Sequence, residues 1–176
     1  MEAARHYTCQ LRLDGEMAFV VWYSGERDGF LRDAGGRLLT ACTLEALAAA
    51  AQARGIGLED AEPSIYDFDR INTWCAAPNA AGVDCQAFLD AWNLFDDLAG
   101  LHTGADNPYA RLSRETAGCY DRLFWGNNLP TVTPPGEQFE PVWSAEELIE
   151  IRRVLAAGLV LLATELPRRG AAEPAL

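Results

Sequence analysis

Residues 84–99 read DCQAFLDAWNLFDDLA, and apolar side chains cover most of the circumference of a helix drawn through them. A helix this apolar is normally enclosed by its neighbours rather than laid on a surface. Its polar residues fall on one narrow stripe: Gln86, Asp90, Asn93 and Asp97. Asp96 falls inside the apolar arc instead, so we expect a buried structural carboxylate that needs hydrogen-bond donors. The nearest candidate donors are Arg122 and the backbone N–H groups of residues 126–128.

An antiparallel sheet is predicted before this helix. Residues 6–13 alternate between apolar and polar side chains, which is typical of a half-buried strand. Asp14-Gly15 is a strong signal for a hairpin turn, and the continuous apolar run of residues 17–24 predicts a returning strand covered on both faces or nearly so. Residues 30–41 contain a further turn with short strands on either side. The N-terminal part is therefore expected to form a meander of three or four strands.

Five helices are expected after the sheet, because helical periodicity, capping residues and prolines mark their ends. Their expected ranges are 44–54, 64–77, 84–99, 107–126 and 144–163. Gly126 is expected to end the fourth helix in the left-handed conformation, and the proline-rich residues 127–143 are expected to form an ordered loop. Together these elements predict an α+β fold, with an N-terminal antiparallel β-meander packed against a bundle of about five helices. We expect one domain over residues 1–166 and a disordered tail over residues 167–176.

The chain is strongly acidic, with a net charge of −12 that comes from 26 acidic residues and 14 basic ones, all of them arginine. This charge repels nucleic acid and anionic membranes, so neither is expected as a partner. It suits a basic partner protein, because complementary charge speeds encounter and helps to choose partners. Solubility alone also explains such a charge.

The five cysteines are scattered and form no C-x-x-C pair, so we expect reduced thiols and no metal site. The N-terminus lacks a signal-peptide pattern, and no run reaches about 18 apolar residues. These features predict a cytoplasmic protein. No glycine-rich phosphate loop or nucleophile motif is present, and no cofactor is expected. The sequence does not indicate an oligomeric state.

Acidic residues are the first candidates for chemistry, because paired carboxylates can bind divalent cations or share acid–base work. They are Asp67, Asp69, Asp96, Asp97 and Asp121. The simpler interpretation is that Asp67 and Asp69 cap the start of a helix and that Asp97 lies in a solvated stripe. The two histidines, His6 and His102, lie far apart in the sequence and beside no nucleophile motif. No motif in this chain identifies a reaction.

A binding surface is expected where the fourth helix meets the proline-rich loop. Trp125 lies at this helix end, directly before the residues GNNLP. Large aromatic side chains beside a structured loop are common at binding surfaces. We predict that Trp125, Asn127, Asn128, Asp97 and Asp121 bind the partner. Asp96 and Arg122 are predicted to be structural polar residues.

Four segments carry a resemblance: RLLTACTLEALAAAAQARGIGLEDAEPSIYDFDRINTWC, DCQAFLDAWNLFDDLA, YDRLFWGNNLP and EPVWSAEELIEIRRVLAAGLVLL. They lie within residues 37–162, and this part of the chain resembles small bacterial proteins, some of which are immunity proteins of polymorphic or contact-dependent toxins. The resemblance implies a cytoplasmic protein that binds and neutralises one toxin, and it assigns no role to any residue. With the acidic charge, it predicts a non-enzymatic binding protein that inhibits a basic toxin. The alternatives are a small hydrolase or metal-dependent enzyme that uses the Asp cluster, and a small-ligand-binding or scaffolding domain.

Overall fold

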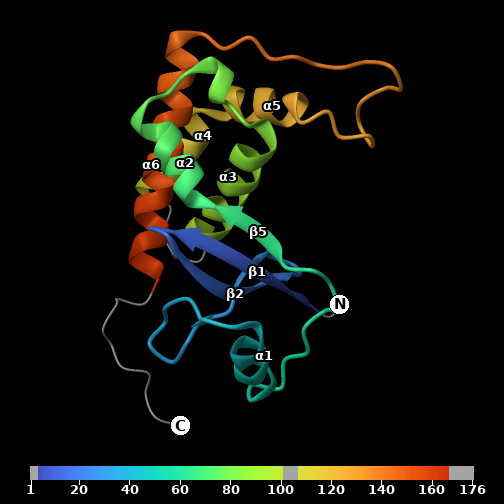
Figure 1. Ribbon diagram of the computed structural model, residues 1–176, viewed down its shortest axis with the longest axis vertical. Helices are drawn as coiled ribbons and strands as arrows, with labels where there is room; N and C mark the ends of the chain where they lie inside the picture. Colours follow the sequence, from blue (N-terminus) through green and yellow to red (C-terminus); the bar gives the residue numbers. More distant parts are fainter. Residues whose placement is uncertain (1–3, 101–106, 167–176) are drawn as a thin grey trace.

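The computed structural model describes residues 4–100 and 107–166, and it has an α+β fold built on one five-stranded sheet. The strands are β1 (Arg5–Leu13), β2 (Glu16–Ser24), β3 (Gly29–Phe30), β4 (Thr40–Ala41) and β5 (Ser64–Asp67). The helices are α1 (Leu44–Gln52), α2 (Phe68–Ala76), α3 (Cys85–Gly100), α4 (Pro108–Glu115), α5 (Ala117–Gly126) and α6 (Ala145–Glu165), with a short 3₁₀ turn η1 (Ala80–Gly82) before α3. Helices α2 to α6 lie on one side of the sheet and α1 lies on the other (Figure 1). The α+β prediction is confirmed.

Strands β1 and β2 form the predicted antiparallel hairpin, with Cys9 paired to Val20. The turn between them uses Asp14 and Gly15, which both adopt positive φ angles, of 54° and 75°. This is the backbone that a tight two-residue hairpin requires. The short strands β3 and β4 both pair with β2 in antiparallel fashion.

Both faces of β2 are covered, as its continuous apolar run predicts. Val20 is fully buried in the main core between the sheet and the helical layer. Its neighbours Phe19 and Val21 point the other way and pack with Leu47 of α1 in a second, smaller core. Because alternate side chains of a strand point to opposite faces, a strand between two layers needs apolar residues at every position.

The segment from Ser64 to Asp67 was expected to begin a helix, and this prediction is wrong. These residues form β5, which pairs in parallel with β1, so that Tyr66 lies opposite Leu11. The backbone groups on the outer edge of β1 supply hydrogen-bond partners that the local sequence pattern does not reveal. Helix α2 begins only at Phe68, because the carboxylate of Asp67 accepts a hydrogen bond from the backbone N–H of Arg70 and caps the helix.

The helix expected over residues 107–126 begins as predicted but is broken in the middle. Asn107 caps α4, with Pro108 at the first helical position. The chain leaves the helical path at Thr116, where φ is −107° and ψ is 19°. The buried hydroxyl of Thr116 donates to the carbonyl oxygen of Leu112, at 2.8 Å. Such a side-chain bond to the backbone competes with the regular hydrogen bonds of a continuing helix. Helix α5 then starts in a new direction, which raises the number of α-helices in the described residues to six.

Gly126 does not take the expected left-handed conformation; Asn128 does, with a φ of 49°. Gly126 is instead the last residue of α5 and is required for space. A Cβ atom there would lie 2.6 Å from the Sγ atom of Cys85 and 2.9 Å from Cγ of Pro141. The glycine therefore allows the end of α5 to approach the start of α3. The following residues up to Ser144 form a loop without helix or strand, and α6 starts at the predicted capping box of Ser144 and Glu147.

Helix α3 is enclosed, as its apolar circumference predicts. Its eight fully or nearly buried side chains are Phe88, Leu89, Ala91, Trp92, Leu94, Phe95, Leu98 and Ala99. It contacts α4, α5 and α6 as well as strands β3 and β5. All of these buried residues belong to the main core. The stripe of polar residues on α3 is the part of its surface that remains accessible.

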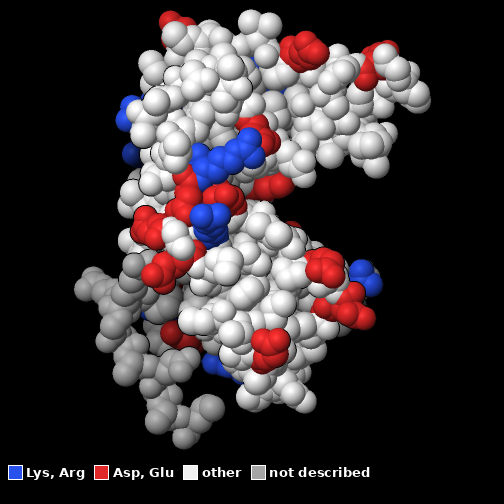
Figure 2. All heavy atoms as spheres, in the orientation of Figure 1, with Lys and Arg blue, Asp and Glu red and all other residues white. Residues whose placement is uncertain are grey.

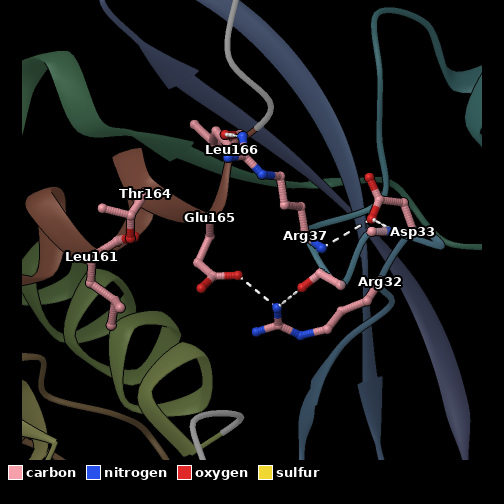
Figure 3. A network of polar contacts seen from close by, with 9 residues as sticks. Arg32, Asp33, Arg37, Leu161, Thr164, Glu165 and Leu166 are labelled. Carbon is pink, nitrogen blue, oxygen red and sulfur yellow. Dashed lines mark hydrogen bonds and ion pairs between the residues drawn. The ribbon is translucent and has the colours of Figure 1, made fainter. Parts of the chain in front are cut away.

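The end of α6 is tied back to the loop between β3 and β4 (Figure 3). The guanidinium of Arg32 forms an ion pair with the carboxylate of Glu165, at 2.8 Å, and also donates to the carbonyl oxygen of Gly36. The side chain of Glu165 is only 7% exposed, so the pair is largely shielded from water. The backbone N–H of Leu38 donates to the carbonyl oxygen of Glu165, and Arg37 donates to that of Leu166. These contacts join the last helix to the N-terminal sheet.

All five cysteines are free thiols, as expected from their spacing. Within residues 4–100 and 107–166, no helix is long and apolar enough to cross a membrane. The expected tail from residue 167 onwards and His102 lie outside the described residues.

Candidate functional site

A half-open cavity of about 230 Å³ lies between α3 and the sheet. Its lining residues come from β1, β2, β3, β5 and α3, and they are Tyr7, Cys9, Trp22, Phe30, Ser64, Tyr66, Asp90, Asn93, Leu94 and Asp97. In Figure 2 the surface is hollowed where the helical layer meets the sheet, and acidic side chains lie along this hollow. The sheet supplies aromatic rings and α3 supplies polar groups, so the cavity has two chemically different walls.

The polar wall is the stripe of α3 that the sequence analysis identified. The carboxylate of Asp97 accepts a hydrogen bond from the indole Nε1–H of Trp22, at 2.8 Å. The amide oxygen of Asn93 accepts from the hydroxyl of Tyr120, also at 2.8 Å, which connects the cavity to α5. Asp90 lies at the accessible mouth and makes no hydrogen bond or ion pair within the described parts of the chain. Along successive turns of α3, the stripe thus presents the carboxylate of Asp90, the amide of Asn93 and the carboxylate of Asp97, which is bonded to Trp22.

The carboxylates of this wall have no Arg or His beside them in the described lining of the cavity. Burial beside the sheet raises the pKa of Asp97, and the nearby charge of Asp28 raises it further, while the bond from Trp22 opposes the rise. Burial also raises the pKa of Asp90, with a smaller contribution from Asp84, although the Asp90 side chain reaches solvent at the mouth. Among the described residues that line the cavity, none is Arg or His. The site is therefore a region of uncompensated negative charge.

The aromatic wall consists of rings from four strands, and Phe30 is the contribution of β3. Tyr7 and Trp22 are cross-strand partners whose ring centroids are 5.7 Å apart. Tyr66 of β5 stands beside them; burial raises the pKa of its hydroxyl, with smaller contributions from Cys9, Asp90 and Asp97. Burial raises the pKa of the Cys9 thiol to about 12, so this thiol is neutral and unreactive at physiological pH. Carboxylates beside aromatic faces are the groups that bind organic cations.

A second pocket, of about 260 Å³, lies in the loop after α5. Its lining residues are Trp125, Val132, Thr133, Pro134, Glu137, Gln138 and Phe139. The side chain of Asn128 holds this loop together, because its amide nitrogen donates to the carbonyl oxygen of Phe139 and its amide oxygen accepts from the N–H of Phe139, at 2.7 Å. The rings of Trp125 and Phe139 remain 48% and 43% exposed. The loop therefore presents an apolar surface that is separate from the acidic cavity.

The residues predicted to bind a partner do not all lie together. Asp97 lines the cavity between α3 and the sheet, whereas Trp125 lines the loop pocket. Asn127 is the C-terminal capping residue of α5, and Asn128 is a bonding partner within the loop. Asp121 is exposed on α5.

Asp96 bonds neither to Arg122 nor to the backbone N–H groups of residues 126–128, the two sets of donors expected for it. Arg122 instead pairs with Glu147 of α6, at 3.0 Å, and donates to the carbonyl oxygen of Val142. Asp96 is half-buried, as expected, and accepts from the hydroxyl of Ser113 on α4. That hydroxyl in turn accepts from the indole N–H of Trp92, at 2.8 Å. Asp96 thus joins α3 to α4, and Arg122 joins α5 to α6.

Asp67 and Asp69, two of the carboxylates considered for metal chemistry, have structural partners. Asp67 caps α2, and the carboxylate of Asp69 pairs with Arg12 at 3.2 Å and accepts from the N–H of Gly15. In the two described parts of the chain, no three His, Cys, Asp or Glu side chains are placed to hold a metal ion together.

Sequence reasoning did not identify Trp22, Tyr66 and Asp90 as site residues. The signal that could have found them is the polar stripe itself. On a helix that is otherwise enclosed, a polar stripe has to face either water or a lined cavity. The identity of the facing strands, and so of the aromatic wall, depends on tertiary packing.

The chain is similar in fold to the crystal structure of the SatS C-terminal domain in complex with bromine. The TM-score is 0.55 and the sequence identity 15%, over 93% of this chain and 94% of that chain. No family model matches the sequence, and no curated protein is significantly similar to it. At this identity the likeness extends to the fold alone, and the resemblance to immunity proteins rests on the sequence segments.

Proposed function

We propose that this chain is a non-enzymatic binding protein whose partner is a basic protein, and that it acts as an immunity-type inhibitor of a basic toxin. The observation that carries the proposal is the acidic cavity between α3 and the sheet. Asp90 and Asp97 supply negative charge there that no described arginine in the lining neutralises. A basic partner would provide the missing positive charge.

The net charge of the whole chain also favours a basic partner. A net charge of −12 attracts a basic protein over distances of about one Debye length, roughly 10 Å at 0.1 M salt. Such attraction raises association rates by up to several orders of magnitude and leaves specificity to the contacts made after encounter. The exposed ring of Trp125 and the apolar loop pocket offer a second contact of the kind that supplies affinity in protein interfaces.

The enzyme alternative receives less support from the geometry. Asp96 bonds to Ser113, Asp121 is exposed on α5, and neither carboxylate lines the cavity beside α3. The thiol nearest the cavity, that of Cys9, is held neutral by burial. The described lining contains no histidine that would serve as a general base at neutral pH.

The test uses the polypeptide encoded next to this chain's gene as the binding partner. Its expression alone should arrest growth, and co-expression of this chain should restore growth. In stopped-flow mixing, the association rate should fall at least tenfold between 50 mM and 300 mM salt, with a much smaller change in the dissociation rate. Failure to bind this polypeptide, or an association rate that is unchanged by salt, would contradict the proposal.

A further inference from the structure

We infer that the cavity between α3 and the sheet is a receptor for one guanidinium group, supplied by an arginine side chain of the partner. This inference rests on the proposed function for the source of the arginine. The shape and chemistry of the cavity supply the argument for the guanidinium itself.

The size of the cavity fits a side-chain head group. Its volume of about 230 Å³ is several times the ~30 Å³ that one water molecule occupies in the liquid. It is smaller than the roughly 300–1,000 Å³ typical of pockets that enclose a whole small-molecule ligand. A single long side chain that enters from a partner surface is therefore the best match.

The arrangement of the carboxylates selects an organic cation over a metal ion. Asp90 and Asp97 are seven residues apart on α3, which corresponds to about 10 Å along the helix axis. Two carboxylates at this spacing cannot chelate one ion at the 2.0–2.6 Å ligand distances of magnesium or calcium. An extended cation with several donors can instead form hydrogen bonds with one carboxylate and be attracted electrostatically by the other.

The free carboxylate is suited to the fork of a guanidinium. One oxygen of Asp97 already accepts from the indole of Trp22. Asp90 has both oxygens available, which is the condition for two parallel N–H···O bonds. We therefore place the guanidinium on Asp90, with Asp97 as a second negative charge deeper in the cavity.

The aromatic wall distinguishes a guanidinium from an ammonium. The rings of Tyr7, Trp22 and Tyr66 line the side of the cavity that faces the carboxylates. A planar, weakly hydrated guanidinium stacks on such rings while it keeps its in-plane hydrogen bonds. An ammonium is more strongly hydrated and cannot make the bidentate contact, so lysine should bind less well than arginine.

The test is a titration of the intact protein with small probes, followed through the indole N–H signals of ¹⁵N-labelled tryptophan. Arginine amide is the probe, lysine amide tests the head group, and citrulline amide has an uncharged side chain of nearly the same shape as that of arginine amide. Trp22→Phe assigns the signal of Trp22. With ionic strength held constant, arginine amide should shift this signal in a saturable way. Lysine amide should bind at least fivefold more weakly, and citrulline amide should cause no saturable shift.

Matched variants test whether the probe binds in the cavity. Asp90→Asn should weaken arginine amide binding at least fivefold, because it removes the charge and one acceptor of the fork while leaving the shape unchanged. Glu45→Gln removes one charge from α1, on the other side of the sheet, and should leave binding unchanged. The other indole signals of each variant confirm that the fold is intact.

Several results would overturn the inference. They are equal affinity for lysine and arginine amides, no saturable shift at Trp22, a shift at Trp125 in its place, and unchanged binding to Asp90→Asn. The proposed function is judged separately. If the neighbouring polypeptide binds Asp90→Asn as tightly as the unaltered chain, the guanidinium receptor is contradicted and the proposed function stands. If arginine amide occupies the cavity but the polypeptide does not bind, the receptor is supported and the proposed function fails.

Discussion

Three aspartates on one helix show how strongly the surroundings decide what a residue does. Asp90 lies at the mouth of the cavity without a bonding partner among residues 4–100 and 107–166, Asp97 accepts from the indole of Trp22, and Asp96 accepts from Ser113 between α3 and α4. Burial raises the pKa of all three. Hydrogen bonds offset the cost of burying the charge for Asp96 and Asp97, but not for Asp90. An unpaired, partly buried carboxylate weakens the fold unless a ligand neutralises it.

We predict that Asp90→Asn stabilises the protein at neutral pH. A raised pKa means that the folded state holds the Asp90 proton more tightly than the unfolded chain does. The favourable contribution is thus complete below the ordinary pKa of 3.8, and it is lost as the pH rises through the folded pKa. In urea unfolding, Asp90→Asn should have the higher free energy of unfolding at pH 7, and the difference should shrink as the pH approaches 4.

The control for this prediction is Asp121→Asn, which removes one negative charge at an exposed position of α5. Its effect should lie within about 0.5 kcal/mol, as for most surface substitutions. A loss of stability in Asp90→Asn at pH 7, or a difference that does not change with pH, would show that Asp90 has a favourable partner in the folded state.

At the scale of elements, the close contact between α3 and α6 sets the position of the polar stripe. The contact is possible because Gly158 of α6 has no side chain; a Cβ atom there would overlap with the ring of Phe95. Both residues are buried in the main core, and Phe95 is also stacked on Phe68 of α2. The ring of Phe95 therefore has no free space to move into.

We predict that Gly158→Ala destabilises the protein by about 2–3 kcal/mol, because overpacking of a tight core outweighs the gain of up to ~1 kcal/mol that alanine brings to a helix. Gly118→Ala in α5 is the matched control. No atom lies within 4 Å of a Cβ at that position, so the substitution should stabilise the protein by about 0.5–1 kcal/mol. Urea unfolding of both variants measures the effects. Equal changes in the two would mean that α3 and α6 are not in close contact.

At the scale of the whole molecule, the chain closes on itself where α6 meets the sheet. The pair of Arg32 and Glu165 joins residues that are 133 positions apart in the sequence, and it lies at the C-terminal end of α6, where positive charge is favoured by the helix dipole. The aromatic wall of the cavity belongs to the sheet and the acidic wall to the helical layer. Contacts that hold these two layers together therefore also maintain the cavity.

We predict that Arg32→Met lowers the free energy of unfolding by about 2–4 kcal/mol, because it removes the cation beside a buried carboxylate. The double variant Arg32→Met/Glu165→Gln should cost less than the sum of the two single variants, since the partners are in contact. Arg111→Met is the control. Its pair with Glu115 is exposed, with side chains 70% and 63% accessible, and its loss should cost at most about 0.5 kcal/mol. Additive costs of Arg32→Met and Glu165→Gln would exclude a coupled pair.

Features that depend on neighbours along the chain could be predicted from the sequence. The hairpin at Asp14-Gly15, the capping box at Ser144 and the enclosure of α3 follow from turn chemistry, local hydrogen bonds and helical periodicity. The α+β class follows from their order. Each of these depends on a few adjacent residues, and so a local pattern is sufficient to predict it.

Features that depend on residues distant in the sequence could not be predicted in this way, because they arise from tertiary packing. Ser64–Asp67 became a strand because the edge of β1, some fifty residues earlier, offered hydrogen bonds that a local pattern does not contain. Asp96 bonds to Ser113 rather than to Arg122. The sequence could not predict this partner, because a helical wheel shows which direction a side chain faces but not which element lies there. For the same reason the polar stripe of α3 was visible in the sequence, but the aromatic strands that turn it into a cavity were not.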